Sequence, residues 1–189
     1  MPRCRRAYRS RTLTTADNGV TMVIVFTTKR NEIRKIEYSF SSTPYGEMLT
    51  AWCNDWLCYA TFTQYLTRDV ALRELRRLFS RATYTLTSRQ EDPTATTPRR
   101  ILLAGTRFRH DVWRALLKVP YGSTMTYSAL AAMAGHGRAV RAVATSVGCN
   151  PISVVVPCHR ILPSSGGIGN YHSGAEIKRR LLEWEGALP

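Results

Sequence analysis

A polar segment that contains two prolines divides the chain. Residues 87–100 are rich in Thr, Ser and charged side chains and include Pro93 and Pro98. Proline removes a backbone donor and is poorly tolerated inside helices and strands, so this composition predicts a linker. We expect an N-terminal domain over 23–86 and a C-terminal domain over 101–189. A chain of 189 residues is long enough to give each part a core.

The part before the linker has strand patterns followed by one helical pattern. β-Prone runs lie at 23–26, 36–41, 47–51 and 56–62. The second and third runs flank the turn signal Thr43-Pro44-Tyr45-Gly46, which favours a small antiparallel sheet. Leu72, Leu75 and Phe79 then share one face of a helix expected over 69–80. The expected class is therefore α/β (α+β).

The part after the linker is mostly helical. An apolar stripe from Phe108 to Leu117 predicts one helix. Thr126–Ala134 and Arg138–Val147 are expected to form two short helices around Gly135-His136-Gly137, which is a helix-turn-helix pattern. Many helix pairs of this kind bind no nucleic acid, so the pattern needs support from the side chains.

The second of these helices has two contrasting faces. Its valines at 140, 143 and 147 are spaced as a core face. Arg138, Arg141, Ala142 and Thr145 form another face that is small and basic. Small side chains let a helix approach a DNA groove, and arginine can contact phosphate or enter a base stack. An ordinary solvated face is the alternative.

The formal net charge is +14 and the isoelectric point is about 10.2. Such a surplus attracts polyanions, which makes nucleic acid the leading partner class, although some basic proteins are merely soluble. Residues 1–22 are rich in arginine and are expected to be a disordered basic arm, an organelle-targeting segment, or sequence upstream of a start at Met22. No apolar run of spanning length or secretory signal is visible, so we expect an intracellular protein, in the cytoplasm or nucleus with DNA.

Five cysteines with irregular spacing do not suggest a disulfide framework, and they favour a reducing compartment. Cys53 and Cys58 are expected to be structural thiols, because no tetrahedral set of metal ligands is evident around them. No metal and no cofactor are expected.

A further cysteine stands in Pro157-Cys158-His159-Arg160, which follows the apolar run 152–156. We expect that run to be extended and buried. Cys158 is then either a nucleophile or a half-buried structural thiol. Neighbouring side chains on a strand point to opposite sides, so Cys158 and His159 need a turn or a bridging water to act together.

The chain ends in a glycine-rich loop and a helix. The loop runs over 163–171. Ser173 and Glu176 match a capping box for the last helix, with Ser173 as N-cap. Ile177, Leu181 and Trp184 are expected to point inward from that helix.

Residues 99–187 resemble the C-terminal domain of the O6-alkylguanine-DNA alkyltransferases. The shared motifs are Gly105-Thr106-x-Phe108, Val112-Trp113, Pro120-Tyr121-Gly122, Thr126-Tyr127, Arg138-Ala139-Val140-Arg141-Ala142-Val143, Asn150-Pro151, Pro157-Cys158-His159-Arg160 and Gly169-Asn170-Tyr171. The first half is similar to the family's variable N-terminal domain more loosely, through the turn at 43–46.

The resemblance implies a catalytic group of four residues. Cys158 would accept the alkyl group and keep it. His159 would deprotonate the thiol through a water, and Glu185 would orient His159. Asn150 would brace the segment that leads to Cys158.

The resemblance also implies a set of DNA and substrate contacts. Tyr127 would contact the guanine and its 3′ phosphate, Arg141 would fill the space of the extruded base, and Ala139 and Ala142 would lie against the minor groove. Tyr171 would form a wall of the guanine pocket. The remaining expected contacts are Arg138 and Arg160, and Arg160 could instead pair with a carboxylate to hold the loop.

The implied activity is irreversible, stoichiometric transfer of an alkyl group from O6-alkylguanine in duplex DNA to Cys158, after the base is flipped out. O4-alkylthymine is a possible second substrate, and a monomer is expected. Three alternatives are a related binding module that recognises alkylguanine without repair and lacks the cysteine, a thiol hydrolase, and a regulatory DNA-binding sensor. The presence of Cys158 argues against the first, and the basic helix argues against the second. The third lacks a visible second DNA-binding unit.

Overall fold

The computed structural model describes residues 13–17, 20–95 and 100–188. The strands are β1 (Leu13–Asp17), β2 (Val20–Thr27), β3 (Lys35–Thr43), β4 (Gly46–Cys53), β5 (Trp56–Phe62), β6 (Thr83–Leu86), β7 (Arg100–Ala104), β8 (Met125–Thr126) and β9 (Ile161–Leu162). The helices are α1 (Arg68–Leu78), α2 (Arg107–Leu116), α3 (Tyr127–Met133), α4 (Val140–Gly148) and α5 (Ala175–Trp184), with short 3-10 turns η2 (Arg30–Glu32) and η3 (Cys158–Arg160). The α/β class expected from the sequence is confirmed.

Seven strands form one mixed sheet in the order β1-β2-β7-β5-β4-β3-β6. The meander β3-β4-β5 is antiparallel, as the turn at 43–46 predicts. The sheet is larger than the small antiparallel sheet that was expected, and it is mixed, because β2 and β5 both pair in parallel with β7 and β3 pairs in parallel with β6. The strand β7 lies far along the chain, so a scan of local patterns did not place it in the sheet.

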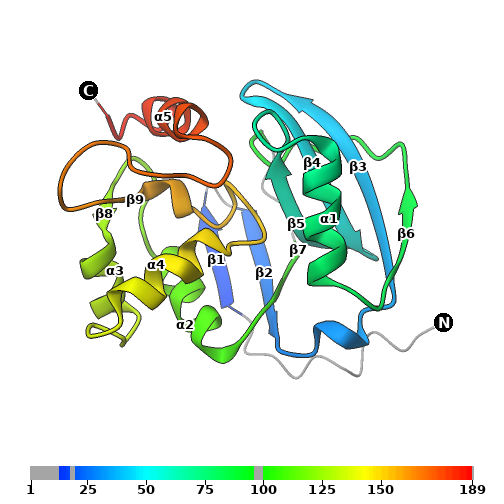
Figure 1. Ribbon diagram of the computed structural model, residues 1–189, viewed down its shortest axis with the longest axis horizontal. Coiled ribbons are helices and arrows are strands. Elements are labelled where there is room, and N and C mark those ends of the chain that lie inside the picture. The colour runs from blue at the N-terminus through cyan, green and yellow to red at the C-terminus, as the bar shows by residue number, and fades with distance from the viewer. Residues whose placement is uncertain (1–12, 18–19, 96–99, 189) are drawn as a thin grey trace.

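Helices cover both faces of the sheet, and the alternation of side chains along each strand explains why (Figure 1). Ile101 and Leu103 of β7 point into the core shared with α2, α4 and α5, whereas Leu102 and Ala104 point into the core shared with α1. A strand with apolar residues on both faces reads as a continuous apolar run, as buried parallel strands do. The molecule therefore has three layers, with α1 on one face of the sheet and α2 to α5 on the other.

Two boundaries differ from those the sequence suggested. The basic arm was placed over 1–22, but 13–17 and 20–22 lie in β1 and β2, which pair antiparallel. The remaining residues of that arm lie outside the described ranges. At the linker, Arg100 already belongs to β7, and 101–104 belong to the sheet and not to the helical part. The division into two domains at 87–100 otherwise remains a prediction.

The helices of the second half lie where the sequence predicts them. Thr106 and Thr126 accept hydrogen bonds from backbone N–H groups in the first turns of α2 and α3, which fixes where those helices begin. The pair α3 and α4 forms the helix-turn-helix, with Arg138 and Ala139 just before α4. No helix in the described part of the chain is long and apolar enough to cross a membrane.

Two expectations for α5 are wrong. Its N-cap is Gly174 and no side chain caps it, while the Ser173 hydroxyl instead lies 3.5 Å from that of Thr61 in β5. Trp184 is 49% exposed, and its place on the buried face is taken by Lys178 and Leu182. Residues 178, 181, 182 and 185 pack against the core. This spacing leaves Trp184 at the edge of the buried face.

The apolar run before Cys158 is buried in part but is not a strand. Ile152 makes one parallel bridge with Ala60, and the chain then turns, with Val154 at a φ of 71°. Cys158 follows in the 3-10 turn η3. The turn that Cys158 and His159 were expected to need is therefore present, and it replaces the extended strand.

Gly105 provides a test of packing between β7 and α2. A Cβ atom at Gly105 would lie 2.7 Å from the ring of Trp113, which is buried. We expect Gly105→Ala to lower the free energy of unfolding by about 1–3 kcal/mol, because the ring has to move within a packed core. Chemical denaturation of the two proteins measures this. Gly137→Ala is the control, since its Cβ would be 3.8 Å from its nearest contact, and an equal loss in both variants would contradict the explanation.

Candidate active site and DNA-facing helix

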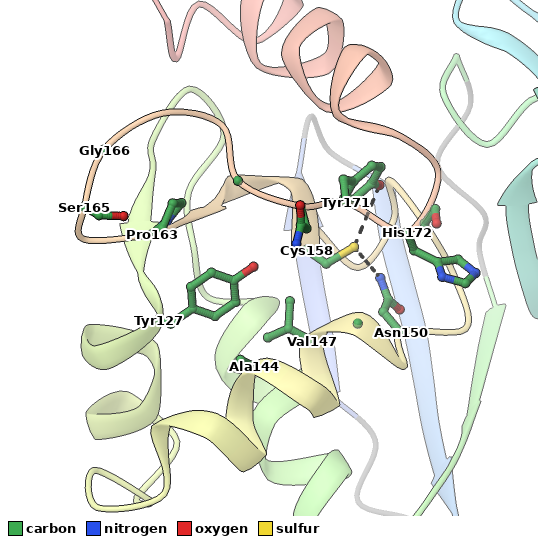
Figure 2. Close-up of a pocket in the computed structure, with 14 residues that line it drawn as sticks. Tyr127, Ala144, Val147, Asn150, Cys158, Pro163, Ser165, Gly166, Tyr171 and His172 are labelled. Atoms are coloured by element: carbon green, nitrogen blue, oxygen red, sulfur yellow. Dashed lines mark hydrogen bonds between the residues drawn. The ribbon is translucent and has the colours of Figure 1, made fainter. Parts of the chain in front are cut away.

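A cavity of about 700 Å³ opens between the end of α4, the turn η3 and the loop over 163–172 (Figure 2). Its wall consists of Tyr127, Ala144, Val147, Gly148, Asn150, Ser153, Cys158, Pro163, Ser165, Gly166, Gly169, Asn170, Tyr171 and His172. Three of the expected site residues besides Cys158 therefore meet here: Tyr127, Asn150 and Tyr171. They come from α3, the end of α4 and the glycine-rich loop, which are far apart in the sequence.

The thiol of Cys158 faces this cavity and is held by two polar side chains. The Asn150 amide donates to Sγ at 3.0 Å, and the thiol donates to the hydroxyl of Tyr171 at 3.8 Å. Figure 2 shows both contacts converging on the sulfur. Cys158 is buried, with only 7% of its surface exposed, so a reactant can reach the sulfur only by entering the cavity.

The side chain of Asn150 also fixes the backbone around the thiol. Its Nδ2 donates to the carbonyl oxygens of Ile152 at 3.2 Å and Val156 at 2.8 Å, and its Oδ1 accepts from the N–H of Ile152 at 3.0 Å. These contacts close the turn between α4 and η3. One amide thus joins the end of α4 to the cysteine.

Behind the cysteine lies a buried group formed by His159, Glu185 and Arg160. Nε2 of His159 lies 2.8 Å from Oε1 of Glu185. Arg160 donates to both oxygens of the same carboxylate at 2.8 Å and to the carbonyl oxygen of Val119 at 2.7 Å. Arg160 was expected either to contact DNA or to pair with a carboxylate, and the structure shows the ion pair with Glu185. Nδ1 of His159 is buried and has no hydrogen-bond partner in the described part of the chain.

Burial and hydrogen bonds shift the ionisation of these groups. Burial raises the pKa of Cys158, although the Asn150 amide opposes it. Burial lowers the pKa of His159, against the effect of Glu185. Burial alone would raise the pKa of Glu185, but hydrogen bonds from His159 and Arg160 lower it to about 2. At neutral pH the site therefore holds a protonated thiol, a neutral imidazole and an ionised carboxylate.

Two groups at the site were missed by the sequence analysis. Lys178 is fully buried on α5, and its ammonium donates to the carbonyl oxygen of Ile161 at 2.7 Å. Burial lowers its pKa to about 8, while the nearby Cys158 acts to raise it. The sequence does carry a signal for this burial, because Lys178 is spaced so that it shares a helix face with the apolar Leu181 and Leu182. Ser153 is buried in the cavity wall, but no local pattern marked it.

The four expected DNA contacts on α4 and just before it lie outside the lining of the cavity. Arg141 and Ala142 are exposed on the first turn of α4, and the exposed Arg138 and the half-buried Ala139 precede that helix. Ala144 and Val147, from a different face of α4, line the cavity. The half-buried Tyr127 begins α3 and points into the cavity. One short helix thus presents small and basic side chains outward and forms a cavity wall.

Cys53 and Cys58 lie in the core on the α1 side of the sheet, away from this site. Cys58 is buried and donates to the carbonyl oxygen of Ala51 at 3.3 Å. In the described ranges, no three His, Cys, Asp or Glu side chains are grouped so that they could hold a metal ion.

Comparison with known proteins identifies the family. Residues 107–187 match the model of the DNA-binding domain of 6-O-methylguanine DNA methyltransferase. The crystal structure of the Mycobacterium tuberculosis O6-methylguanine methyltransferase is 30% identical, has a TM-score of 0.61, and aligns with 82% of this chain and 95% of that one. The chain belongs to the 6-O-methylguanine DNA methyltransferase family.

Curated relatives in this family align with less than half of this chain. The methylated-DNA–protein-cysteine methyltransferase of Methanosarcina acetivorans is 45% identical over 83 residues, which are 44% of this chain and 53% of that protein. The chain therefore matches about half the length of such relatives. A crystal structure of the Mycobacterium tuberculosis protein in complex with DNA is 29% identical, with a TM-score of 0.62, and aligns with 80% of this chain and 93% of that one.

The pKa of His159 can be measured to test the opposing effects of burial and of Glu185 on it. We expect the pKa of His159 to lie below its ordinary value of 6.5 and to fall further in Glu185→Gln, because the carboxylate favours the charged imidazole. The pH dependence of the imidazole proton resonances measures both values, and His159→Gln assigns the signal. A higher pKa in Glu185→Gln would contradict the arrangement described.

Proposed function

We propose that this protein repairs DNA by transferring the alkyl group of O6-alkylguanine to Cys158. The observation that carries the proposal is the thiol of Cys158, which lies in the wall of a 700 Å³ cavity with Asn150 on its sulfur and the pair His159–Glu185 behind it. Family membership and the names of the relatives support the same reaction.

The chemistry is a displacement at carbon. The sulfur attacks the alkyl carbon, an S–C bond forms, and the C–O6 bond breaks with its electron pair staying on guanine. Sulfur is the nucleophile that suits this step, provided that the thiol loses its proton. Overall, the thiol proton passes to guanine, and the products are unmodified guanine and a thioether.

His159 is the base in this proposal. The raised pKa of Cys158 keeps the thiol protonated until a base acts on it, and the lowered pKa of His159 keeps the imidazole neutral and able to accept a proton. Nε2 is occupied by Glu185, so Nδ1 is the nitrogen left to receive the proton, through a water between it and the sulfur. Glu185 stabilises the imidazolium that forms, and Asn150 holds the sulfur and its turn.

Duplex DNA is the partner that the remaining features fit. A guanine in the stack cannot reach a buried sulfur, so it has to rotate out, at a cost of a few kcal/mol. Arg138, Ala139, Arg141 and Ala142 would lie against the minor groove, with Arg141 taking the place of the extruded base. Tyr127 and Tyr171 would contact the guanine at the two sides of the cavity.

The proposal includes three further points. The protein acts as a monomer in the cell, on O6-alkylguanine. It needs no metal or cofactor. Each molecule acts once, because a thioether is a stable product. A non-repairing module that only binds alkylguanine is not favoured, since Cys158 is present and held for reaction.

The first test follows the alkyl group. We expect duplex DNA with labelled O6-methylguanine to place one label on each protein molecule, at Cys158, because the thiol is consumed. Peptide mass analysis locates the label and a titration gives the stoichiometry. Cys149→Ser is the matched control and should react normally, whereas Cys158→Ser should not react. Label at another residue, or several turnovers per molecule, would refute the assignment.

The second test separates base flipping from chemistry. We expect Arg141→Ala to slow repair in duplex DNA by at least about tenfold, the effect of losing one to two kcal/mol of transition-state stabilisation. Reaction with free O6-benzylguanine needs no flipping and should change little. The control is Arg81→Ala, at an exposed arginine beyond α1. Equal losses on the two substrates would count against the role of Arg141.

A further inference from the structure

A second cavity, of about 840 Å³, lies beside the first. Parts of α1, η2, the start of α2 and the end of α4 form it. It shares Gly148, Asn150 and His172 with the cavity that holds Cys158. The two cavities are therefore neighbours across a thin wall, and a molecule that occupies one passes close to the other.

Arginine dominates the second cavity, which we call the arginine groove. Its guanidinium groups are those of Arg30, Arg77, Arg107 and Arg109. In the described ranges none of the four has a carboxylate within 4.0 Å, although other arginines of this chain do. Arg109 donates to the sulfur of Cys149 at 3.2 Å, and the other three side chains make no hydrogen bond with described residues.

One acid lines the groove, and its carboxylate is already engaged. Glu74 accepts from the hydroxyl of Tyr59 at 3.1 Å and lies 2.9 Å from Nε2 of His172. Four guanidinium groups against one carboxylate leave three positive charges around one cavity. Like charges gathered in a concave surface repel one another and concentrate anions.

Phosphate is the anion that fits these groups. Guanidinium binds phosphate oxygens through two parallel N–H groups, and it does so best when no carboxylate competes. If a guanine occupies the neighbouring cavity, its strand continues on both sides of the extruded nucleotide. Successive phosphates of that strand are only a few ångströms apart along the axis, about 3.4 Å in duplex DNA. The shared wall at Gly148 and Asn150 places the groove within reach of the next few phosphates.

We propose that the arginine groove binds the phosphates of the DNA strand that flank the extruded nucleotide. The N-terminal half of the chain, through Arg30 of η2 and Arg77 of α1, then takes part in DNA binding together with α4. This inference rests on the proposed function, because it is the alkylated base in the cavity of Cys158 that brings the strand to the groove.

The test compares two double variants that remove the same charge. Arg77→Gln/Arg107→Gln alters the groove. Arg34→Gln/Arg81→Gln alters two exposed arginines that lie near the β3–β6 edge of the sheet and line neither cavity. Fluorescence anisotropy measures binding of a duplex with a central O6-methylguanine over a series of salt concentrations. To keep the complex from reacting, all the proteins carry Cys158→Ser.

We expect the groove variant to bind more weakly and with a flatter salt dependence. Each phosphate contact contributes about 0.9 to the slope of log K against log salt, so the loss of two contacts reduces the slope by about 1.8. The edge variant should keep the wild-type slope. Arg77→Lys/Arg107→Lys retains the charge and should recover most of the slope. Unchanged binding in the groove variant, or an equal loss in the edge variant, would overturn the proposal.

Reaction with free O6-benzylguanine separates this inference from the function it rests on. With Cys158 restored, the groove variant should react with the free base at the wild-type rate, because Arg77 and Arg107 do not line the cavity of Cys158. If the groove variant reacts more slowly with the free base, the substitutions disturb the cavity of Cys158. That result would overturn the proposal that the groove arginines act only by binding phosphate. If the wild-type protein itself labels no cysteine, the proposed function fails, and the salt slopes still decide whether the groove binds DNA.

Discussion

The side chain of Asn150 holds the site together. Its amide reaches the sulfur of Cys158, two carbonyl oxygens and one N–H, all within 3.2 Å. Pro151 cannot continue a helix, and in the turn that follows, the N–H of Ile152 is paired with the Asn150 side chain. A buried polar group left unpaired costs about 1–3 kcal/mol, which makes this amide hard to replace. The position of the thiol relative to α4 depends on it.

Burial has opposite consequences for the three ionisable groups around the thiol. It keeps Cys158 protonated and His159 neutral, which are the states that the proposed reaction needs in the thiol and in the base. Glu185 escapes the same effect only because His159 and Arg160 both donate to it. Arg160 is thus a partner of the carboxylate more than a contact for DNA. The ion pair leaves Glu185 charged in a place where a lone carboxylate would be neutral.

The sheet joins the two halves of the chain. β7 follows the polar segment at 87–100, yet it pairs with β2 and β5, so the second half starts inside the sheet of the first. The carbonyl oxygen of Pro151 accepts from Ala60 of β5, and Ala60 accepts from Ser153, which fixes the end of α4 against the first half. Glu74 of α1 meets His172 of the loop around the cavity. These contacts create the wall between the two cavities.

The sequence by itself determined the helices and the antiparallel meander. Apolar spacing placed α1 to α4, and threonine caps set the starts of α2 and α3. The family resemblance, which the motifs around Cys158 carry, implied His159, Glu185 and Asn150 as its partners. These features depend on neighbours within a few turns, or on motifs that are contiguous in the chain. Only the tertiary structure decided what depends on distant residues. It brought β7 into the sheet, buried Lys178 and not Trp184 in α5, and replaced the expected strand before Cys158 with a turn tied by Asn150. It also gathered Arg30, Arg77, Arg107 and Arg109, which span nearly eighty positions of sequence, around one groove, because spatial proximity between separate elements leaves no periodic trace along the chain.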